Sequence, residues 1–177
     1  MNPFPERLVM CMRELLKTVV VLSLGVVLGS VLTERGSAQQ AGVTGVRMNH
    51  VGVSVTNFDE SVRFYTQTLG FREAYRLRDD KGNPTMSYIQ ISRETFLELA
   101  PANANRPAGL SHVGIEADDI TATVARLRQA GAQIQDPRFA ANTNVTLTNV
   151  TDPQGIRVEY LQLNPDSLQR KAIESWK

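Results

Sequence analysis

Two stretches of the chain alternate between apolar residues and small or polar residues with the two-residue period of a β-strand. In MNHVGVSV (48–55), three valines share one face, and His50 lies on the other face with a glycine and a serine. In LSHVGIEA (110–117), His112 occupies the same place in an equivalent pattern. Because a helix can cover each apolar face, we expect both histidines to point to the open side of a sheet.

The two stretches belong to an internal repeat. Residues 47–71 align without a gap with residues 109–133, and in both copies the sequence His-Val-Gly is followed by a polar pair, a helical pattern and a glycine. These final glycines, Gly70 and Gly131, are the expected C-terminal stops of two helices.

The helical pattern of each repeat predicts a cap and a buried face. In the first repeat Asn57 is the predicted N-cap, with Glu60 at the capping-box spacing. In the second repeat the cap is either Asp118 or Asp119. The apolar positions at helical intervals are expected to be buried, namely Phe58, Val62, Tyr65 and Leu69 in the first helix and Ile120, Val124 and Leu127 in the second.

Short strand patterns separated by turn residues follow each helix. They cover 73–78, 85–92 and 95–100 in the first repeat and, most clearly, 145–150 and 156–163 in the second. The sequence therefore predicts an α+β domain, 46–163, made of two tandem βαβββ units, 46–101 and 109–163. A polar link, 102–108, joins the units. The tail, 164–177, contains a short predicted helix, and its Trp176 is expected to pack on the domain or on a second subunit.

The first 38 residues have the pattern of a secretory signal peptide. Three basic residues, Arg7, Arg13 and Lys17, precede an apolar run at 18–32, and small residues follow up to Ala38. An uncleaved membrane anchor is the alternative, but the apolar run is shorter than the roughly 20 residues of a membrane-spanning helix. We therefore expect an exported protein, periplasmic or extracellular, or a membrane-anchored one if the leader is retained.

Charge and cysteine content exclude several functions. Four of the 19 basic and three of the 18 acidic residues lie in the first 38 positions, so the remainder is formally neutral and shows no nucleic-acid surface. The single cysteine, Cys11, precedes the apolar run. A chain cleaved after the leader would therefore have neither a disulfide nor a cysteine nucleophile.

Each repeat also places one glutamate in its last strand pattern, at nearly the same separation from its histidine. Glu98 follows His50 by 48 positions, and Glu159 follows His112 by 47. Each position alone is well explained as a hydrogen-bonded histidine or a solvated glutamate, but all four coincide in the repeat. Imidazole nitrogen and carboxylate oxygen are ligands of Zn, Ni, Co, Mn and Fe(II), and four of them leave two positions free on a six-coordinate ion. The set predicts a catalytic metal site.

These residues resemble the vicinal oxygen chelate superfamily, the group of glyoxalases, bleomycin-resistance proteins and extradiol dioxygenases. The resemblance covers about residues 46–163 and is carried by NHVGVSVTNFDESVRFYTQTLGF (49–71), SHVGIEADDI (111–120) and VTDPQGIRVEYLQL (150–163). It implies that the two units form a curled mixed sheet around a metal-binding cleft. The family's ligand positions fall on His50, Glu98, His112 and Glu159.

The resemblance also implies a chemistry. Members with glyoxalase I or methylmalonyl-CoA epimerase activity move a proton next to a carbonyl group, with a divalent metal holding the substrate oxygens. We therefore expect a metal-dependent lyase or isomerase for a small oxygenated molecule, with Glu159, or otherwise Glu98, as the base. Zn or Ni is the expected metal, with Fe or Mn as alternatives, and a homodimer is a family expectation. No convincing match to the family's glutathione-binding residues is present.

Two other functions remain open. An extradiol dioxygenase uses two histidines and one carboxylate on Fe(II), and Glu98 would then fill one of the positions that such an enzyme keeps free. A binding protein that sequesters a drug or metabolite generally lacks the metal ligands. Arg76, Arg78 and Tyr88 either reach the cleft and bind an anionic substrate or are solvated strand residues.

Overall fold

The computed structural model describes residues 44–177, which contain the compact unit Gly45–Lys177. The predicted leader, 1–38, and Cys11 lie outside the described residues. Within 44–177, no helix has both the length and the apolar character needed to cross a membrane.

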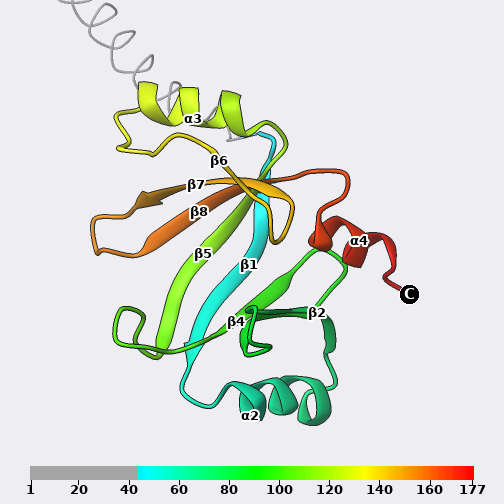
Figure 1. Cartoon of the computed structure of the whole chain (residues 1–177). Coiled ribbons are helices and arrows are strands. Elements are labelled where there is room, and N and C mark those ends of the chain that lie inside the picture. The colour runs from blue at the N-terminus through cyan, green and yellow to red at the C-terminus, as the bar shows by residue number, and fades with distance from the viewer. Residues whose placement is uncertain (1–43) are drawn as a thin grey trace, which may run out of the picture. The chain divides into compact units, whose positions relative to one another are not determined.

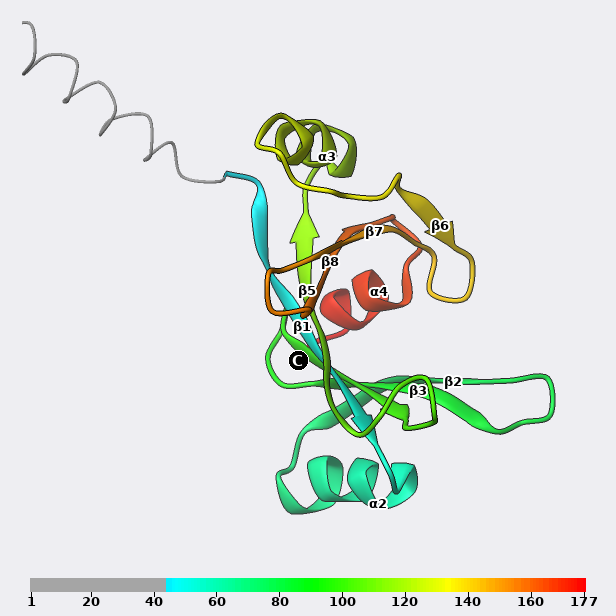
Figure 2. The same cartoon turned by 90° about the vertical axis from the view of Figure 1, so that its left-hand side faces the viewer.

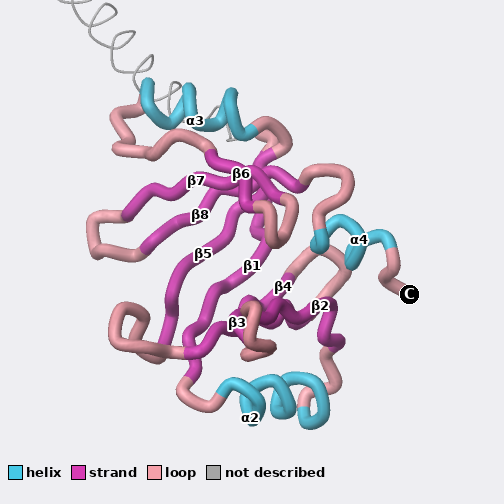
Figure 3. Tube along the Cα trace, viewed as in Figure 1, coloured by secondary structure: helices cyan, strands magenta, loops and turns pink. Residues whose placement is uncertain are grey.

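The described chain forms one curled mixed sheet with helices around it (Figures 1 and 3). The strand order is β2-β3-β4-β1-β5-β8-β7-β6. The strands are β1 (Val46–Val55), β2 (Arg72–Arg78), β3 (Pro84–Gln90), β4 (Phe96–Pro101), β5 (Gly109–Ala117), β6 (Arg138–Ala140), β7 (Val145–Thr151) and β8 (Arg157–Leu163). The helices are α2 (Phe58–Arg63), which continues into the π-helical segment η1 (Phe64–Thr68), α3 (Ile120–Gln129) and α4 (Leu168–Glu174).

The strand pairing repeats in the two halves, as the sequence repeat predicts. In the first unit β1 pairs with β4 in parallel, and in the second β5 pairs with β8 in parallel. The remaining neighbours within each unit are antiparallel hairpins. The antiparallel pair of β1 and β5 joins the units. The predicted α+β fold of two βαβββ units forming one curled sheet is therefore confirmed, and its three-residue β6 is an element that the sequence pattern did not predict clearly.

Helix α2 begins at the predicted cap. The Asn57 side chain accepts a hydrogen bond of 3.3 Å from the Glu60 N–H, and Asn57 Nδ2 donates to Glu60 Oε2 at 2.6 Å. The helix buries Phe58 and Val62 against the valine face of β1. Both α2 and α3 lie on the outside of the sheet, at its two ends in Figure 2.

The prediction that Leu69 is buried is wrong. Its side chain is 46% exposed, because the helix widens into a π-helical turn over Phe64–Thr68. A π-helical turn contains more residues than an α-helical turn, so it rotates the following positions away from the face that the 3.6-residue period predicts. Gly70, which has a positive φ, ends the helix. Phe71, directly after it, packs in place of Leu69 against the buried cluster that contains Phe58 and Val62.

Helix α3 resolves the choice between two caps. Asp119 is the N-cap, and its Oδ1 accepts a hydrogen bond of 2.9 Å from the Ala122 N–H. Asp118 forms an ion pair with Arg47 at 2.6 Å. Ile120 and Val124 are buried as predicted and pack against Ile134, whereas Leu127 is only partly buried.

The tail forms the predicted helix, α4, which connects the two units. Ala172 and Ile173 join a buried cluster that contains Tyr88 and Phe96 from the first unit and Leu161 from the second. The helix therefore packs across the seam between the repeats. Trp176, beyond its end, is 37% exposed, and the expected contact with a second subunit stays a prediction.

Candidate metal centre

Strand register brings the four predicted ligands to the seam between the units. In the antiparallel pair of β1 and β5, His50 lies opposite Gly114, and His112 lies opposite Gly52. In the outer parallel pairs, Glu98 lies beside Gly52 and Glu159 beside Gly114. Each glycine is thus flanked by a histidine on one side and a glutamate on the other, and all six positions share the inner face of the sheet.

The two glycines make room for the imidazole rings. A Cβ atom on Gly52 would lie 2.1 Å from His112 Cε1, and one on Gly114 would lie 2.1 Å from His50 Cε1. Real Cβ atoms do not approach other atoms this closely, so any larger residue would displace the ring. The glycine of each His-Val-Gly motif therefore leaves space for the imidazole ring of the histidine in the other unit.

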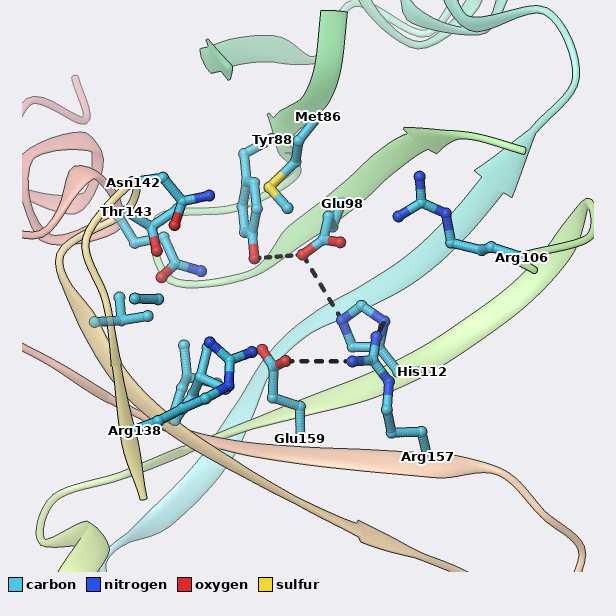
Figure 4. Close-up of a pocket in the computed structure, with 15 residues that line it drawn as sticks. Met86, Tyr88, Glu98, Arg106, His112, Arg138, Asn142, Thr143, Arg157 and Glu159 are labelled. Atoms are coloured by element: carbon cyan, nitrogen blue, oxygen red, sulfur yellow. Dashed lines mark hydrogen bonds and ion pairs between the residues drawn. The ribbon is translucent and has the colours of Figure 1, made fainter. Parts of the chain in front are cut away.

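The side chains meet at one point. The two Nε2 atoms of His50 and His112 are 2.8 Å apart, and Glu98 Oε2 lies 3.7 Å from each of them. Glu159 Oε1 lies 3.8 Å from His50 Nε2. All four residues are buried. The structure therefore places all four predicted residues at the seam, with His50, Glu98 and His112 close enough to share one ion and Glu159 beside His50. Figure 4 shows Glu98, His112 and Glu159 around a pocket.

The donor set and its spacing fit a divalent metal. His50, Glu98 and His112 each offer one ligand atom, and these atoms lie within 4.8 Å of one another. Two ligand atoms bound about 2.1 Å from one ion are about 3 to 4 Å apart, which is close to the measured separations. The group can thus hold an ion with small adjustments of its side chains.

Burial keeps both histidines neutral, which is the form that binds metals. It lowers the pKa of His50 to about 3, with additional repulsion from His112 and Arg157. It also lowers the pKa of His112 to about 4, to which Arg157 and Arg106 contribute.

His50 is oriented by a buried polar network. Its Nδ1 lies 2.9 Å from Asn49 Oδ1, an acceptor, so the proton is on Nδ1 and the lone pair of Nε2 points to the centre. Asn49 is adjacent to His50 and would lie on the opposite face of a regular strand. A β-bulge between Met48 and His50 brings both side chains to buried positions, which the alternation in the sequence does not reveal.

His112 has a different environment. Arg157 NH2 lies 2.6 Å from its Nδ1, and Ser111 Oγ lies 3.1 Å from the same atom. A guanidinium only donates hydrogen bonds, so Arg157 favours the tautomer with the lone pair on Nδ1 and the proton on Nε2. Metal binding through Nε2 requires the other tautomer, in which Ser111 Oγ accepts the Nδ1 proton. The Arg157 side chain, 40% exposed, has room to turn away.

The two glutamates differ as well. Glu98 Oε2 accepts a hydrogen bond of 2.8 Å from the Tyr88 hydroxyl, and burial raises the pKa of Glu98 although Tyr88 counteracts the effect. Burial and the neighbouring Glu98 raise the pKa of Glu159 to about 7, against the influence of Arg157 and Arg138. Within residues 44–177, Glu159 forms an ion pair with Arg157 at 3.7 Å, lies 3.8 Å from the neutral His50 ring, and makes no side-chain hydrogen bond. Glu159 is therefore held less firmly than Glu98.

A cavity of about 220 Å³ opens beside this group. Tyr88 lines it together with Arg106, Arg138 and Arg157 (Figure 4). Of the two interpretations of Tyr88 from the sequence, the structure therefore supports the one in which it reaches the cleft. The interpretation of Arg76 and Arg78 as substrate-binding residues is wrong, because neither lines the cavity. Arg76 binds the carboxylates of Glu73 and Asp59, and Arg78 donates to the Gly82 carbonyl.

The sequence reasoning missed several residues of the site. Arg157 lies two positions before Glu159 on the same strand, so strand alternation was a usable signal for it. Arg106 in the link, Arg138 in the short β6, and the network of Asn49 and Gln169 had no such signal.

Comparisons with known proteins agree with this geometry. The family model described as "Glyoxalase/Bleomycin resistance protein/Dioxygenase superfamily" matches residues 47–160. The chain is 28% identical over 123 residues to the uncharacterized protein YaeR of Escherichia coli K12, covering 66% of this chain and 95% of YaeR. It is 23% identical over 125 residues to a lactoylglutathione lyase of Neisseria meningitidis, covering 66% of this chain and 91% of the lyase.

A solved structure shows the same fold. Methylmalonyl-CoA epimerase of Streptomyces coelicolor in complex with 2-nitronate-propionyl-CoA aligns with a TM-score of 0.57 and 20% sequence identity. The alignment covers 68% of this chain and 96% of that one.

Proposed function

The chain belongs to the Glyoxalase/Bleomycin resistance protein/Dioxygenase superfamily, and we propose that it is a metal-dependent lyase or isomerase that moves a proton next to a carbonyl group of a small substrate. The observation that carries the proposal is the convergence of two neutral, buried imidazoles and two buried carboxylates at the seam of the repeats. The relatives named as lactoylglutathione lyases support the same class of chemistry.

His50, His112, Glu98 and Glu159 would hold the ion, with Zn or Ni as the proposed metal. A divalent ion bound there polarises a carbonyl oxygen and stabilises the negative charge that develops on it. The Asn49 side-chain oxygen Oδ1 keeps the His50 ring in its ligand orientation, and the Tyr88 hydroxyl does the same for the Glu98 carboxylate.

Glu159 is the proposed proton carrier. In the metal-free chain the pKa of Glu159 is about 7, so once this carboxylate leaves the ion it can take up and return a proton near neutral pH. The carboxylate takes the proton from the carbon next to the carbonyl, and the electron pair of the broken C–H bond moves toward the carbonyl oxygen. The proton on the Glu159 carboxyl group exchanges with solvent, and its transfer to the neighbouring carbon completes the isomerisation. Glu159 suits this role better than Glu98, because the latter is held by Tyr88.

One observation favours a second candidate function. Taken alone, His50, Glu98 and His112 are a set of two histidines and one carboxylate, the set used by Fe(II) oxygenases. The position of Glu159, 3.8 Å from His50, adds a fourth ligand and leaves fewer places for catechol and oxygen. We therefore place proton transfer first and the extradiol dioxygenase second.

We also propose that the protein is exported by the leader at 1–38. The support is the order of basic residues, apolar run and small residues in the sequence. N-terminal sequencing of the protein from its native host is expected to start near residue 39, whereas an intact N-terminus would favour the membrane anchor.

Metal analysis of protein purified without chelators tests the main proposal. We expect about one Zn or Ni per chain, and loss of the metal in a variant that combines Glu98→Gln with Glu159→Gln. Glu94→Gln, on an exposed glutamate outside the cavity, is the matched control and should retain the metal.

The reaction class is tested on the loaded protein by incorporation of solvent deuterium into carbonyl substrates. Fe(II) with oxygen consumption on catechols would support the dioxygenase instead. A protein that takes up no divalent metal would overturn both enzyme proposals and leave the binding protein.

A further inference from the structure

The cavity beside the candidate ligands has a surplus of positive charge. Its charged lining consists of two glutamates, Glu98 and Glu159, and three arginines, Arg106, Arg138 and Arg157. A divalent ion on the candidate ligands would add to this surplus. Arg138 is exposed and the Arg157 side chain is 40% exposed, so both guanidinium groups can donate to an anionic ligand that enters the cavity.

The Arg106 guanidinium binds a backbone carbonyl and not a carboxylate. One guanidinium nitrogen donates 2.8 Å to the Pro101 carbonyl, and its buried Nε has no hydrogen-bond partner among residues 44–177. The same part of the chain provides no carboxylate within ion-pair distance of it. Its charge acts on the Glu98 side of the site, where it helps to lower the pKa of Glu98 against the larger effect of burial.

Arg138 occupies the other side. It extends from the short β6 into the cavity lining, and none of the carboxylates that the structure describes forms an ion pair with it. Its charge acts on Glu159, opposing the effect of burial on that pKa. In Figure 4 the two glutamates lie between Arg106 and Arg138.

We propose that the cavity binds a small dicarboxylic acid that carries the reacting carbonyl group, with one carboxylate on Arg106 and the other on Arg138. This inference rests on the proposed function, since it names the substrate class of the same site. A guanidinium binds a carboxylate through two parallel N–H···O hydrogen bonds, which fixes its direction as well as its position. Two such anchors hold the middle of the molecule, with its acidic carbon, beside Glu98 and Glu159.

The size of the cavity favours a free acid over a substrate carried on a large group. At about 220 Å³ it is below the roughly 300 to 1,000 Å³ of common ligand pockets. A carrier such as coenzyme A would have to extend into a neighbouring hollow of about 440 Å³. Among residues 44–177, the cations that line that hollow are Arg106 and Arg157, which already belong to the cavity, so this part of the chain offers the carrier's phosphates no further positive charge there.

Calorimetric titration of the full chain with matched acids tests the inference. The ligands are succinate and glutarate, compared with the monocarboxylates butyrate and valerate of the same chain lengths, and the protein is used both as purified and loaded with Zn. We expect each dicarboxylate to bind at least tenfold more tightly than its monocarboxylate. Arg106→Gln and Arg138→Gln should each weaken dicarboxylate binding about tenfold or more, as expected for a charge-assisted hydrogen-bonded pair, and should remove most of the preference.

Three controls keep the result interpretable. Arg126→Gln removes the same charge from an exposed position of α3 outside the cavity and should change the affinity less than twofold. Arg106→Lys and Arg138→Lys keep the charge but lose the two-pronged geometry, so they should recover only part of the affinity. Circular dichroism verifies that the variants are folded.

Equal binding of mono- and dicarboxylates, or unchanged binding in both glutamine variants, would overturn the inference. So would competition by coenzyme A that depends on Arg106, since the cation would then serve a carrier. The metal content is measured separately. If the protein prefers dicarboxylates but takes up no metal, the proposed enzyme is refuted and the arginine site stands. If it takes up metal but shows no preference for dicarboxylates, the arginine site is refuted and the proposed enzyme stands.

Discussion

Gln169 Nε2 donates a hydrogen bond of 2.9 Å to Asn49 Oδ1, although 120 positions separate the two residues in the chain. The same oxygen accepts from His50 Nδ1, and Asn49 Nδ2 donates 3.2 Å to Glu116 Oε2. The amide is thus fixed at both ends by residues that are almost completely buried. Helix α4, which lies beyond the family match at 47–160, thereby determines the orientation of a candidate metal ligand.

Replacing Gln169 by Leu should weaken metal binding. The Asn49 amide would lose the donor that fixes its oxygen, and losing such an outer contact of a ligand typically costs about 10- to 100-fold in metal affinity. Competition with a chromophoric chelator measures the affinity, and ¹⁵N NMR of the His50 ring should show a smaller fraction of the Nδ1–H tautomer. Gln67→Leu, at an exposed position, is the control. Wild-type affinity in Gln169→Leu would show that the network only supports the fold.

Replacing Gly52 or Gly114 by Ala should destabilise the protein and remove the metal together. The new methyl group would lie 2.1 Å from the opposite imidazole, so the ring or the strand has to move. Overpacking of this kind costs about 1 to 3 kcal/mol or more. Urea unfolding and metal analysis measure the two effects. Ser54→Ala, on the same strand and face as Gly52, removes a buried hydroxyl that has no hydrogen-bond partner among residues 44–177, so it should not destabilise the protein and should leave the metal bound.

Replacing Glu159 by Gln should have opposite effects on stability with and without metal. The pKa of Glu159 is raised to about 7 in the folded chain from 4.5, so the carboxylate favours folding when protonated and loses this contribution as the pH rises through 7. In the presence of a chelator, Glu159→Gln should therefore be more stable than the wild type at pH 8, by up to about 3 kcal/mol, and the difference should vanish toward pH 4.5.

Added metal should reverse this order, because an amide is a poorer ligand than a carboxylate. Urea unfolding at the two pH values, with and without chelator, gives the four stabilities. A chelator-treated Glu159→Gln variant that is less stable than the wild type at pH 8 would contradict the assignment.

Replacing Arg157 by Gln should strengthen metal binding. Arg157 places a positive charge near the site and donates to His112 Nδ1 at 2.6 Å, which favours the tautomer that does not bind through Nε2. Without it, Ser111 Oγ can accept the Nδ1 proton, and we expect about a tenfold gain in Zn affinity, or about 1.4 kcal/mol. Chelator competition measures it, with Arg126→Gln as the charge control. Weaker binding in Arg157→Gln would show that the guanidinium supports the site and does not oppose the metal.

The repeat, the two βαβββ units and the four candidate ligands were predictable from the amino-acid sequence. These follow from local and periodic signals. Alternation places His50 and His112 on one face of their strands, and caps such as Asn57 begin helices. The nearly equal spacings of 48 and 47 positions from these histidines to Glu98 and Glu159 indicate a common site. Such signals depend on residues close together in the chain or on a duplication that leaves the same pattern twice.

The way in which the two halves complete each other emerges only in the folded domain. The crossing of His112 over Gly52 and of His50 over Gly114 depends on the register between β1 and β5. The bulge at Asn49 and the π-helical turn before Leu69 break the periods on which the sequence reasoning depends. Contacts such as Gln169 with Asn49 join residues whose proximity no local pattern encodes, because strand pairing and helix packing are chosen by the burial of the whole domain.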